Sequence, residues 1–222
     1  MSIWGSLLGG LIGFSFGGPF GALLGSFIGS KISSNNNSQY EKISTNQKQH
    51  IFALSLIVLS AKLSKVDGHV SKEELLAVKE KLRIPENEID QVAKIFNKAK
   101  EDSSGFEIYA EQIAQIFKDN FNILEEVINI LFYIAESDGK VSNSEELMIA
   151  NIAHIFGLSQ NQYERIKESR KESDKLNPYV VLESSPEDDL QIIRKRYIRL
   201  SKEHHPDLLL NKGIPEEIIN ES

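Results

Sequence analysis

The residues with the clearest chemical character lie near the C-terminus, where His205, Pro206 and Asp207 follow one another. Pro206 lacks a backbone N–H and biases the residue before it away from helical angles, so it predicts a turn. That turn presents an imidazole and a carboxylate side by side. Both groups form directional hydrogen bonds.

A short basic helix is predicted directly before this turn, over residues 191–204. Apolar residues at helical spacing give it one face, made of Leu190, Ile193, Tyr197 and Leu200. A stripe of cations lies on a different face, made of Lys195, Arg199 and Lys202. The turn therefore stands at the end of a positively charged rod.

This region resembles the J-domain of the DnaJ co-chaperones. The matching segments are NPYVVL (177–182) for a first helix, IRKRYIRL (193–200) for a second, and HPD (205–207) for the loop. The segment DLLLNKGIP (207–215) is more narrowly similar to the DjlA branch, whose members are membrane-anchored. The competing interpretation is a basic amphipathic helix that ends in an ordinary proline turn.

Three features depart from the J-domain pattern. Glu183 stands where the family usually has glycine, and Glu203 where many members have a basic residue. Only PEEIINES (215–222) represents the third helix, and a segment this short is not stable unaided. We therefore expect an incomplete J-domain over residues 171–222, in a sequence that is a fragment or a truncated product.

Composition excludes several other classes of protein. The 222 residues carry a net charge of −7, which argues against a nucleic-acid-binding surface. No cysteine is present, so the chain has no disulfide, thiolate zinc site or cysteine nucleophile. No phosphate-binding glycine loop, HExxH pair or Ser/His/Asp arrangement is visible. We expect no catalytic site.

The N-terminal segment, residues 1–32, is predicted to be a transmembrane anchor. No residue from 3 to 30 is charged. As a helix the 28 residues from 3 to 30 would reach about 42 Å at ~1.5 Å per residue, and a hydrocarbon core is about 30 Å thick. Glycine recurs at every fourth position, at Gly5, Gly9, Gly13, Gly17, Gly21, Gly25 and Gly29. Such a stripe allows close helix packing in a membrane, which predicts a homodimer through the anchor.

Alternative interpretations of this segment fit less well. A signal peptide would begin with positive residues, and a flexible leader would be polar. A membrane pore would need a polar face. The N-terminal WGSLLG (4–9) extends the resemblance to DjlA, and Pro19 either kinks the helix or divides it.

A polar linker, residues 33–49, follows the anchor and contains SSNNNS (33–38). Lys31, Lys42 and Lys48 lie on this side, whereas no lysine or arginine precedes Lys31. This bias predicts a single-pass protein of the bacterial inner membrane with cytoplasmic C-terminal domains.

Residues 50–170 read as an all-α bundle. Apolar residues recur at helical spacing in seven segments, at 51–63, 75–82, 89–96, 108–117, 123–134, 147–156 and 163–166. The intervening segments carry turn signals, such as Asp-Gly and Pro-Glu. No segment has the pattern of a strand between hairpin turns.

An internal repeat lies within this bundle. DGHVSKEE (67–74) and DGKVSNSE (138–145) are separated by 71 residues. In each copy a serine and a glutamate three residues later fit a helix capping box, namely Ser71 with Glu74 and Ser142 with Glu145. This pattern resembles the TerB domain, a helical fold that DjlA-like proteins carry between anchor and J-domain.

The repeat also offers candidate ligands for a divalent metal. Asp67, Glu74, Asp138 and Glu145 could supply oxygen atoms, and TerB domains have been linked with metal binding. Helix capping is the competing explanation for these carboxylates. The spacing of a calcium-binding EF-hand loop is absent.

Two functions remain open. The first is a membrane-anchored co-chaperone that recruits DnaK and stimulates its ATPase, with DnaK and membrane lipid as partners. The resemblance implies that Arg194, Lys195, Arg199 and Lys202 dock on an acidic DnaK surface. It implies that His205, Pro206 and Asp207 act on the coupling between DnaK domains. The second is a TerB-like scaffold or stress or metal sensor with a vestigial J-region.

The glycine stripe is open to a direct test. Replacing Gly13, Gly17 and Gly21 with leucine should abolish cross-linking between protomers, because bulky side chains prevent close approach of the backbones. Insertion, measured as resistance to carbonate extraction, should be retained. Unchanged cross-linking would show that the stripe has another purpose.

Overall fold

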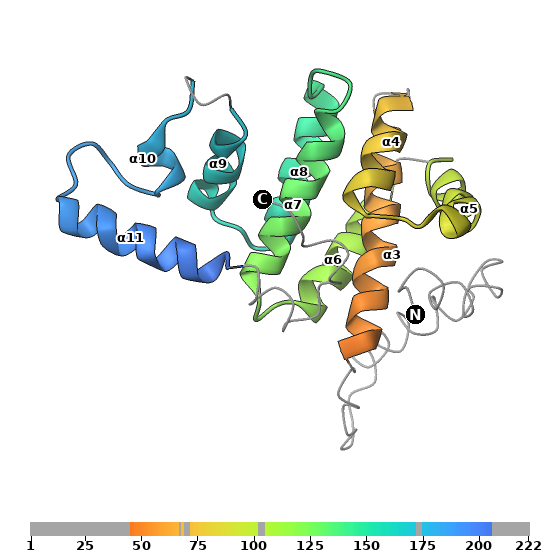
Figure 1. Cartoon of the computed structure of the whole chain (residues 1–222), viewed down its shortest axis with the longest axis horizontal. Helices are drawn as coiled ribbons and strands as arrows, with labels where there is room; N and C mark the ends of the chain where they lie inside the picture. Colours follow the sequence, from red (N-terminus) through yellow and green to blue (C-terminus); the bar gives the residue numbers. More distant parts are fainter. Residues whose placement is uncertain (1–44, 67, 69–71, 102–104, 172–174, 206–222) are drawn as a thin grey trace, which may run out of the picture.

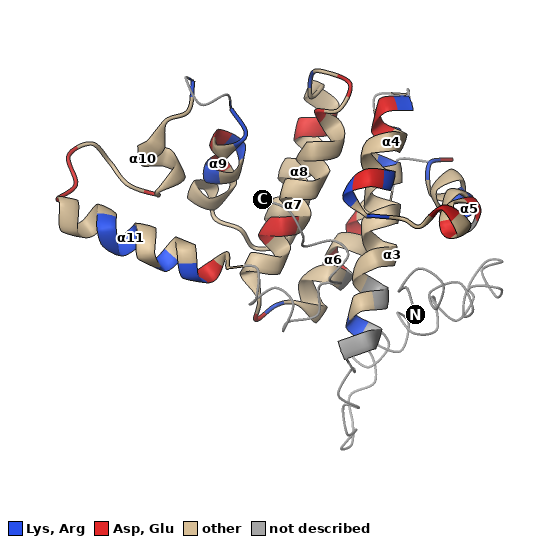
Figure 2. Cartoon of the chain, viewed as in Figure 1, with Lys and Arg blue, Asp and Glu red and all other residues tan. Residues whose placement is uncertain are grey.

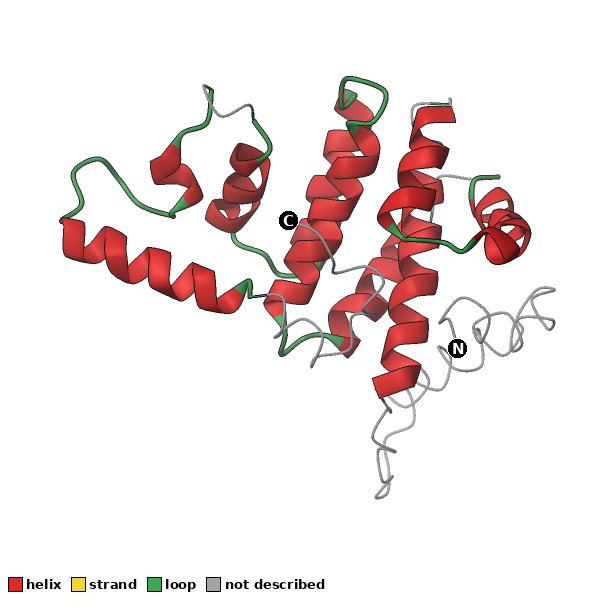
Figure 3. Cartoon of the chain, viewed as in Figure 1, coloured by secondary structure: helices red, strands yellow, loops and turns green. Residues whose placement is uncertain are grey.

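The computed structural model describes residues 45–66, 68, 72–101, 105–171 and 175–205. Over these residues the chain is helical without a strand, as predicted (Figure 3). The anchor glycines, most of the polar linker and the segment after His205 lie outside the described residues. Within the described ranges, none of the helices combines the length and apolar character needed to cross a membrane.

The helices follow the predicted apolar segments closely. Each of the seven segments lies on a different helix from α3 to α9 and runs past it by at most one residue, whereas the helices extend up to six residues beyond the segments. In chain order the elements are α3 (Thr45–Leu63), α4 (Lys72–Lys81), the 3₁₀ turn η2 (Glu86–Glu88), α5 (Ile89–Ala99), α6 (Phe106–Ile116), α7 (Phe121–Ala135), α8 (Asn143–Ile155), α9 (Gln160–Ser169), α10 (Pro178–Val181) and α11 (Leu190–Glu203).

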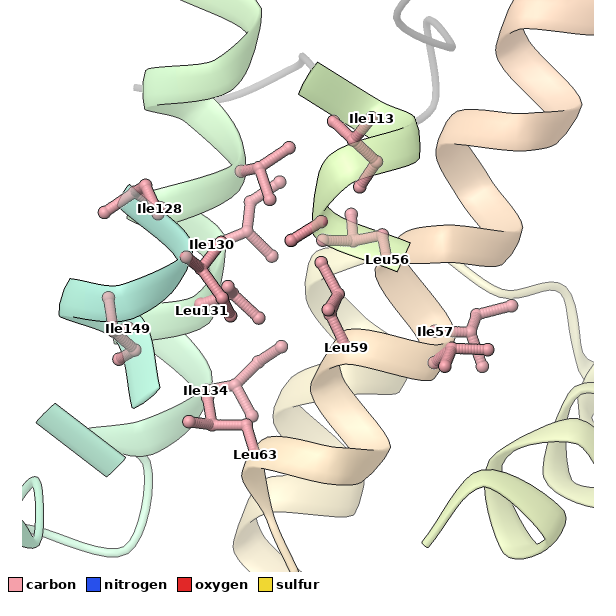
Figure 4. Packing of buried hydrophobic residues seen from close by; sticks show 14 of the residues in the cluster. Leu56, Ile57, Leu59, Leu63, Ile113, Ile128, Ile130, Leu131, Ile134 and Ile149 are labelled. Carbon is pink, nitrogen blue, oxygen red and sulfur yellow. The ribbon is translucent and has the colours of Figure 1, made fainter. Parts of the chain in front are cut away.

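Helix α3 is the centre of the domain. Every side chain from Phe52 to Leu63 is buried, so this helix has no solvent face there. A helix that is buried on all sides must be enclosed by others, and α3 packs against α5, α6, α7 and α8 (Figure 1). Figure 4 shows Leu59 and Leu63 of α3 among the side chains of α7, including Ile134. The buried hydroxyl of Ser60 donates to the carbonyl of Leu56 at 2.7 Å, which satisfies it within the helix.

The two copies of the internal repeat form similar turns. Gly68 and Gly139 have φ angles of +92° and +113°, which favour glycine. Each glycine N–H donates to the carbonyl three residues earlier, at 2.9 and 3.0 Å. In the second copy the predicted capping box is present: Ser142 N donates to Glu145 Oε2 at 2.8 Å, and Glu145 N donates to Ser142 Oγ at 3.2 Å. Ser71 of the first copy lies outside the described residues.

The aromatic pair at the base of the core gives a stability prediction. Phe117 is fully buried and packs edge-on against Phe52, with ring centroids 5.7 Å apart. Phe117→Ala should lower the free energy of unfolding by about 3–5 kcal/mol, because it leaves a cavity that neighbours fill only partly.

Urea unfolding of the detergent-solubilised chain, followed by far-UV circular dichroism, measures this loss. The matched control is Leu147→Ala, at a side chain that is 67% exposed. Its effect should stay within about 0.5 kcal/mol. Equal effects at the two positions would contradict the assignment of Phe117 to the core.

Candidate functional site

The predicted basic stripe lies on α11, at the side of the molecule opposite α5 (Figure 1). Arg194, Lys195, Arg199 and Lys202 are all exposed, and Figure 2 shows the lysines and arginines along this helix. The helix begins where the side chain of Asp189 accepts a hydrogen bond from the backbone N–H of Gln191. The cations three and four residues apart therefore share one accessible face.

The predicted apolar face of α11 is only partly covered. Leu200 is buried and Ile193 is half-buried, whereas Tyr197 and Leu190 are exposed. Leu190 is 80% exposed to solvent. The contact between α11 and the rest of the described chain therefore depends little on apolar burial.

The short helix α10 joins α11 to the bundle. Asn177 caps it by accepting from the N–H of Tyr179 at 3.1 Å, and Pro178 occupies its first turn. The backbone N–H of Asn177 also donates to Glu168 of α9 at 2.6 Å. Hydrogen bonds from Lys171 and from Asn177 lower the pKa of Glu168. The carboxylate thereby fixes the chain as it leaves α9.

Glu183 occupies a strained turn between α10 and α11. Its φ of +52° is left-handed, a conformation that costs a non-glycine residue roughly 1–2 kcal/mol. Its carboxylate accepts from Arg165 Nε at 3.0 Å and from Arg199 Nη2 at 2.5 Å. Two guanidinium groups from different helices thus bracket one side chain. The hydrogen bond that Arg199 donates to Glu183 is the main cause that raises the pKa of Arg199.

Glu125 is a buried carboxylate at the other end of this arrangement. Its side chain is 3% exposed, and it accepts from Arg165 Nη2 at 2.6 Å and from Gln162 Nε2 at 3.0 Å. His204 Nε2, at the end of α11, lies 3.0 Å from Glu125 Oε2. Burial alone would raise the pKa of Glu125, but the hydrogen bonds and charges of His204 and Arg165 outweigh it, so the pKa is lowered.

These contacts form one continuous ion-pair chain between the bundle and the basic helix. Its members, in order of contact, are His204, Glu125, Arg165, Glu183, Arg199 and Glu203. Sequence reasoning did not find Glu125 or Arg165, because they are 40 residues apart and share no motif. It noted Glu183 and Glu203 only as departures from a pattern.

A groove of about 410 Å³ lies between the start of α7, α9 and the end of α11. Arg199, Lys202 and His204 line it on the α11 side, and the half-exposed ring of Phe121 lines it on the α7 side. His205 follows directly and is exposed, whereas Pro206 and Asp207 lie outside the described residues. Arg199 and Lys202, two of the predicted docking cations, therefore line a groove whose other side is formed by the helical bundle.

Among the described residues, the candidate metal ligands do not form a metal-binding cluster. Glu145 engages its carboxylate in the capping box, Glu74 is buried, and Asp138 is exposed. Asp67 lies outside the described residues. In the part of the chain that the structure describes, no group of three or more His, Asp or Glu side chains is placed to hold a metal. The metal site stays a prediction.

Comparison with known proteins finds two family models that match this chain. The family model described as tellurite resistance protein TerB matches residues 53–168, more than half of the chain. The chain belongs to the TerB family. A second model, the transmembrane domain of co-chaperone DjlA, matches residues 1–34. This match supports membrane anchoring through the N-terminal segment of the TerB-family chain.

Curated relatives cover both parts of this TerB-family protein. The co-chaperone protein DjlA of Vibrio parahaemolyticus is 26% identical, over 80% of this chain and 74% of its own length. The DjlA of Legionella pneumophila is 24% identical over 77% and 71%, and that of Haemophilus ducreyi is 22% identical over 78% and 73%. No solved structure matches the chain significantly. The predicted resemblance is confirmed, and the chain is a DjlA-like protein.

The buried carboxylate of Glu125 gives a pH-dependent prediction. Glu125→Gln should lower the free energy of unfolding at pH 7 by about 2 kcal/mol, because it weakens charged hydrogen bonds in a buried setting. The folded-state pKa of Glu125 is lowered, so its stabilisation is fully present above its unfolded pKa of about 4.3 and is lost as pH falls through the folded value.

The difference in free energy of unfolding between wild type and Glu125→Gln should therefore decrease as the pH falls below about 4. Urea unfolding curves at stepped pH values measure it. Glu164→Gln, at an exposed carboxylate on α9, is the matched control and should stay within about 0.5 kcal/mol of wild type. A constant difference from pH 7 to pH 3 would contradict the ion pairing of Glu125.

Proposed function

We propose that this DjlA-like protein is a co-chaperone that recruits a DnaK-type chaperone to the cytoplasmic face of the bacterial inner membrane and stimulates its ATPase. The observation that carries the proposal is the exposed cationic stripe of α11, which leads directly into His205 and the HPD sequence. The similarity to relatives named co-chaperone protein DjlA supports the same role.

The stripe suits docking on an acidic surface. Lys195, Arg199 and Lys202 are spaced so that their side chains align on one face of a capped helix. Exposed charges of this kind accelerate association by steering and fix the orientation of the complex. The chain then places the HPD turn against the partner, and the nucleotide chemistry belongs entirely to the chaperone.

The N-terminal segment confines this activity to the membrane. The lysines that follow it favour a cytoplasmic position for the helical domain and for α11. The glycine stripe would pair two copies, so that two basic helices act at one place. We assign the chain no enzymatic activity of its own and no nucleic-acid partner.

The proposal is tested with the full chain in lipid nanodiscs. Its addition should raise the steady-state ATPase rate of DnaK, and His205→Gln should abolish the rise, because glutamine cannot reproduce the geometry of the imidazole ring. Asp207→Asn should act likewise by removing the charge. A wild-type chain that leaves the ATPase rate unchanged would contradict the proposed function.

A charge-matched pair of variants separates docking from general electrostatics. Lys202→Glu should slow association with DnaK by about tenfold or more and reduce its salt dependence. Lys140→Glu changes the net charge equally, at an exposed lysine in the turn between α7 and α8. It should leave association nearly unchanged. Equal slowing by both variants would remove α11 as the docking surface.

A further inference from the structure

The arginine of the docking stripe is already paired inside the chain. Arg199 Nη2 lies 2.5 Å from Glu183, and Arg199 Nη1 lies 2.9 Å from Glu203, while the side chain remains 45% exposed. Glu183 and Glu203 are the two positions at which acidic residues replace the expected glycine and base. An acidic partner that docks on α11 therefore meets a cation whose hydrogen bonds are in use.

The pairing with Glu183 extends into the bundle. Glu183 also binds Arg165, whose side chain is 12% exposed, and Arg165 binds the buried carboxylate of Glu125. Glu183 is thereby fixed to α9 and α7, whereas Glu203 moves with α11 because it lies one helical turn from Arg199. Of the two carboxylates on Arg199, Glu183 is the one that ties α11 to the bundle.

A second polar contact acts at the same end of α11. His204 Nε2 lies 3.0 Å from Glu125 Oε2, so both ends of the ion-pair chain return to this helix. Apolar burial contributes little, because Leu200 is the one large apolar side chain of α11 that is buried. Partly exposed ion pairs stabilise weakly, so a partner that competes for the same cations could displace this attachment of α11 to the bundle.

The backbone of Glu183 supports a role for its side chain. A non-glycine residue with φ of +52° is strained, and glycine would adopt this turn more easily. The strain is offset here by the two guanidinium groups that the carboxylate binds. A turn alone does not need a glutamate at this position.

We propose that Glu183 is an internal competitor for the acidic surface of the chaperone and thereby sets the affinity of docking. In the closed arrangement it holds Arg199 and α11 against α9 and α7. The carboxylates of the partner replace it, and α11 is released from the bundle. This inference rests on the proposed function for the identity of the partner, but the closed arrangement stands on the contacts within the chain.

The size of the effect follows from a two-state equilibrium. The apparent dissociation constant equals the intrinsic constant divided by the fraction of molecules in the released arrangement. An attachment that leaves about one fifth of the molecules released weakens binding about fivefold, which corresponds to about 1 kcal/mol. Removing the competing carboxylate should recover this factor.

The first experiment measures the closed arrangement without any partner. The chain has no cysteine, so cysteines introduced at Leu147 on α8 and Leu190 on α11, both strongly exposed, carry spin labels. Labelled full-length chain is diluted with unlabelled chain in nanodiscs, which suppresses distances between protomers. Double electron–electron resonance then reports the separation of α11 from the bundle.

Wild type should give a narrow distance distribution, and both Glu183→Gln and Glu183→Gly should give a broader one. Glutamine removes the charge and keeps the size, whereas glycine also relieves the strained turn. Glu187→Gln is the matched control in the same loop, because Glu187 accepts a hydrogen bond from Ser185 and pairs with no cation among the described residues. Unchanged distributions in both Glu183 variants would overturn the inference.

The second experiment measures binding to DnaK in its ATP state. Both Glu183 variants should bind about fivefold more tightly than wild type, and Glu187→Gln should bind as wild type does. In an Arg199→Gln background, Glu183→Gln should give much less gain, since competition for Arg199 is then absent.

Equal affinities in wild type and the Glu183 variants would overturn the competition. An absence of binding in every variant would instead overturn the proposed function, and the distance measurements would still decide whether Glu183 holds α11 in place.

Discussion

Burial of α3 on all sides is the constraint on which the rest of the domain depends. A helix without a solvent face cannot exist until α5, α6, α7 and α8 surround it, so the other helices form one enclosure around it. This requirement fixes α7 with its inner face against α3. It also fixes the N-terminal part of α7, where the carboxylate of Glu125 contacts Arg165 and His204. The packing of α7 against α3 therefore determines where α11 attaches to the bundle.

The local parts of this structure were predictable from the sequence. Helical periodicity located α4 to α9 because each covers the core with an apolar face, and it located α3 because apolar residues recur there at helical spacing. The Asp-Gly turns and the serine-glutamate pair of the second repeat were also predicted, since Gly139 and the Ser142 capping box depend on residues a few positions apart. Such features are determined by neighbours in the chain.

The candidate site was predictable only in part. The exposed cations of α11 follow from its period, but their ion-pair partners do not, because Glu125 and Arg165 come from helices that only the tertiary fold brings to α11. Glu183 was visible as a departure from the J-domain pattern. Its contact with two arginines required knowledge of the left-handed turn that aims it between them.

Helices α3 to α9 are held by apolar packing and α11 by polar contacts, so we expect these two regions of the described chain to differ in local stability. Helices α3 to α9 share one apolar core and therefore open together, at a free energy close to that of global unfolding. Helix α11 is held by a few polar contacts, so we expect its amide hydrogens to exchange through small, frequent openings that leave the core intact. The segment that we propose to meet a partner is thus also the one that we expect to detach from the bundle at the lowest free energy. If a partner binds there, the exchange rate of α11 should report occupancy of that surface, while the rest of the domain should remain protected.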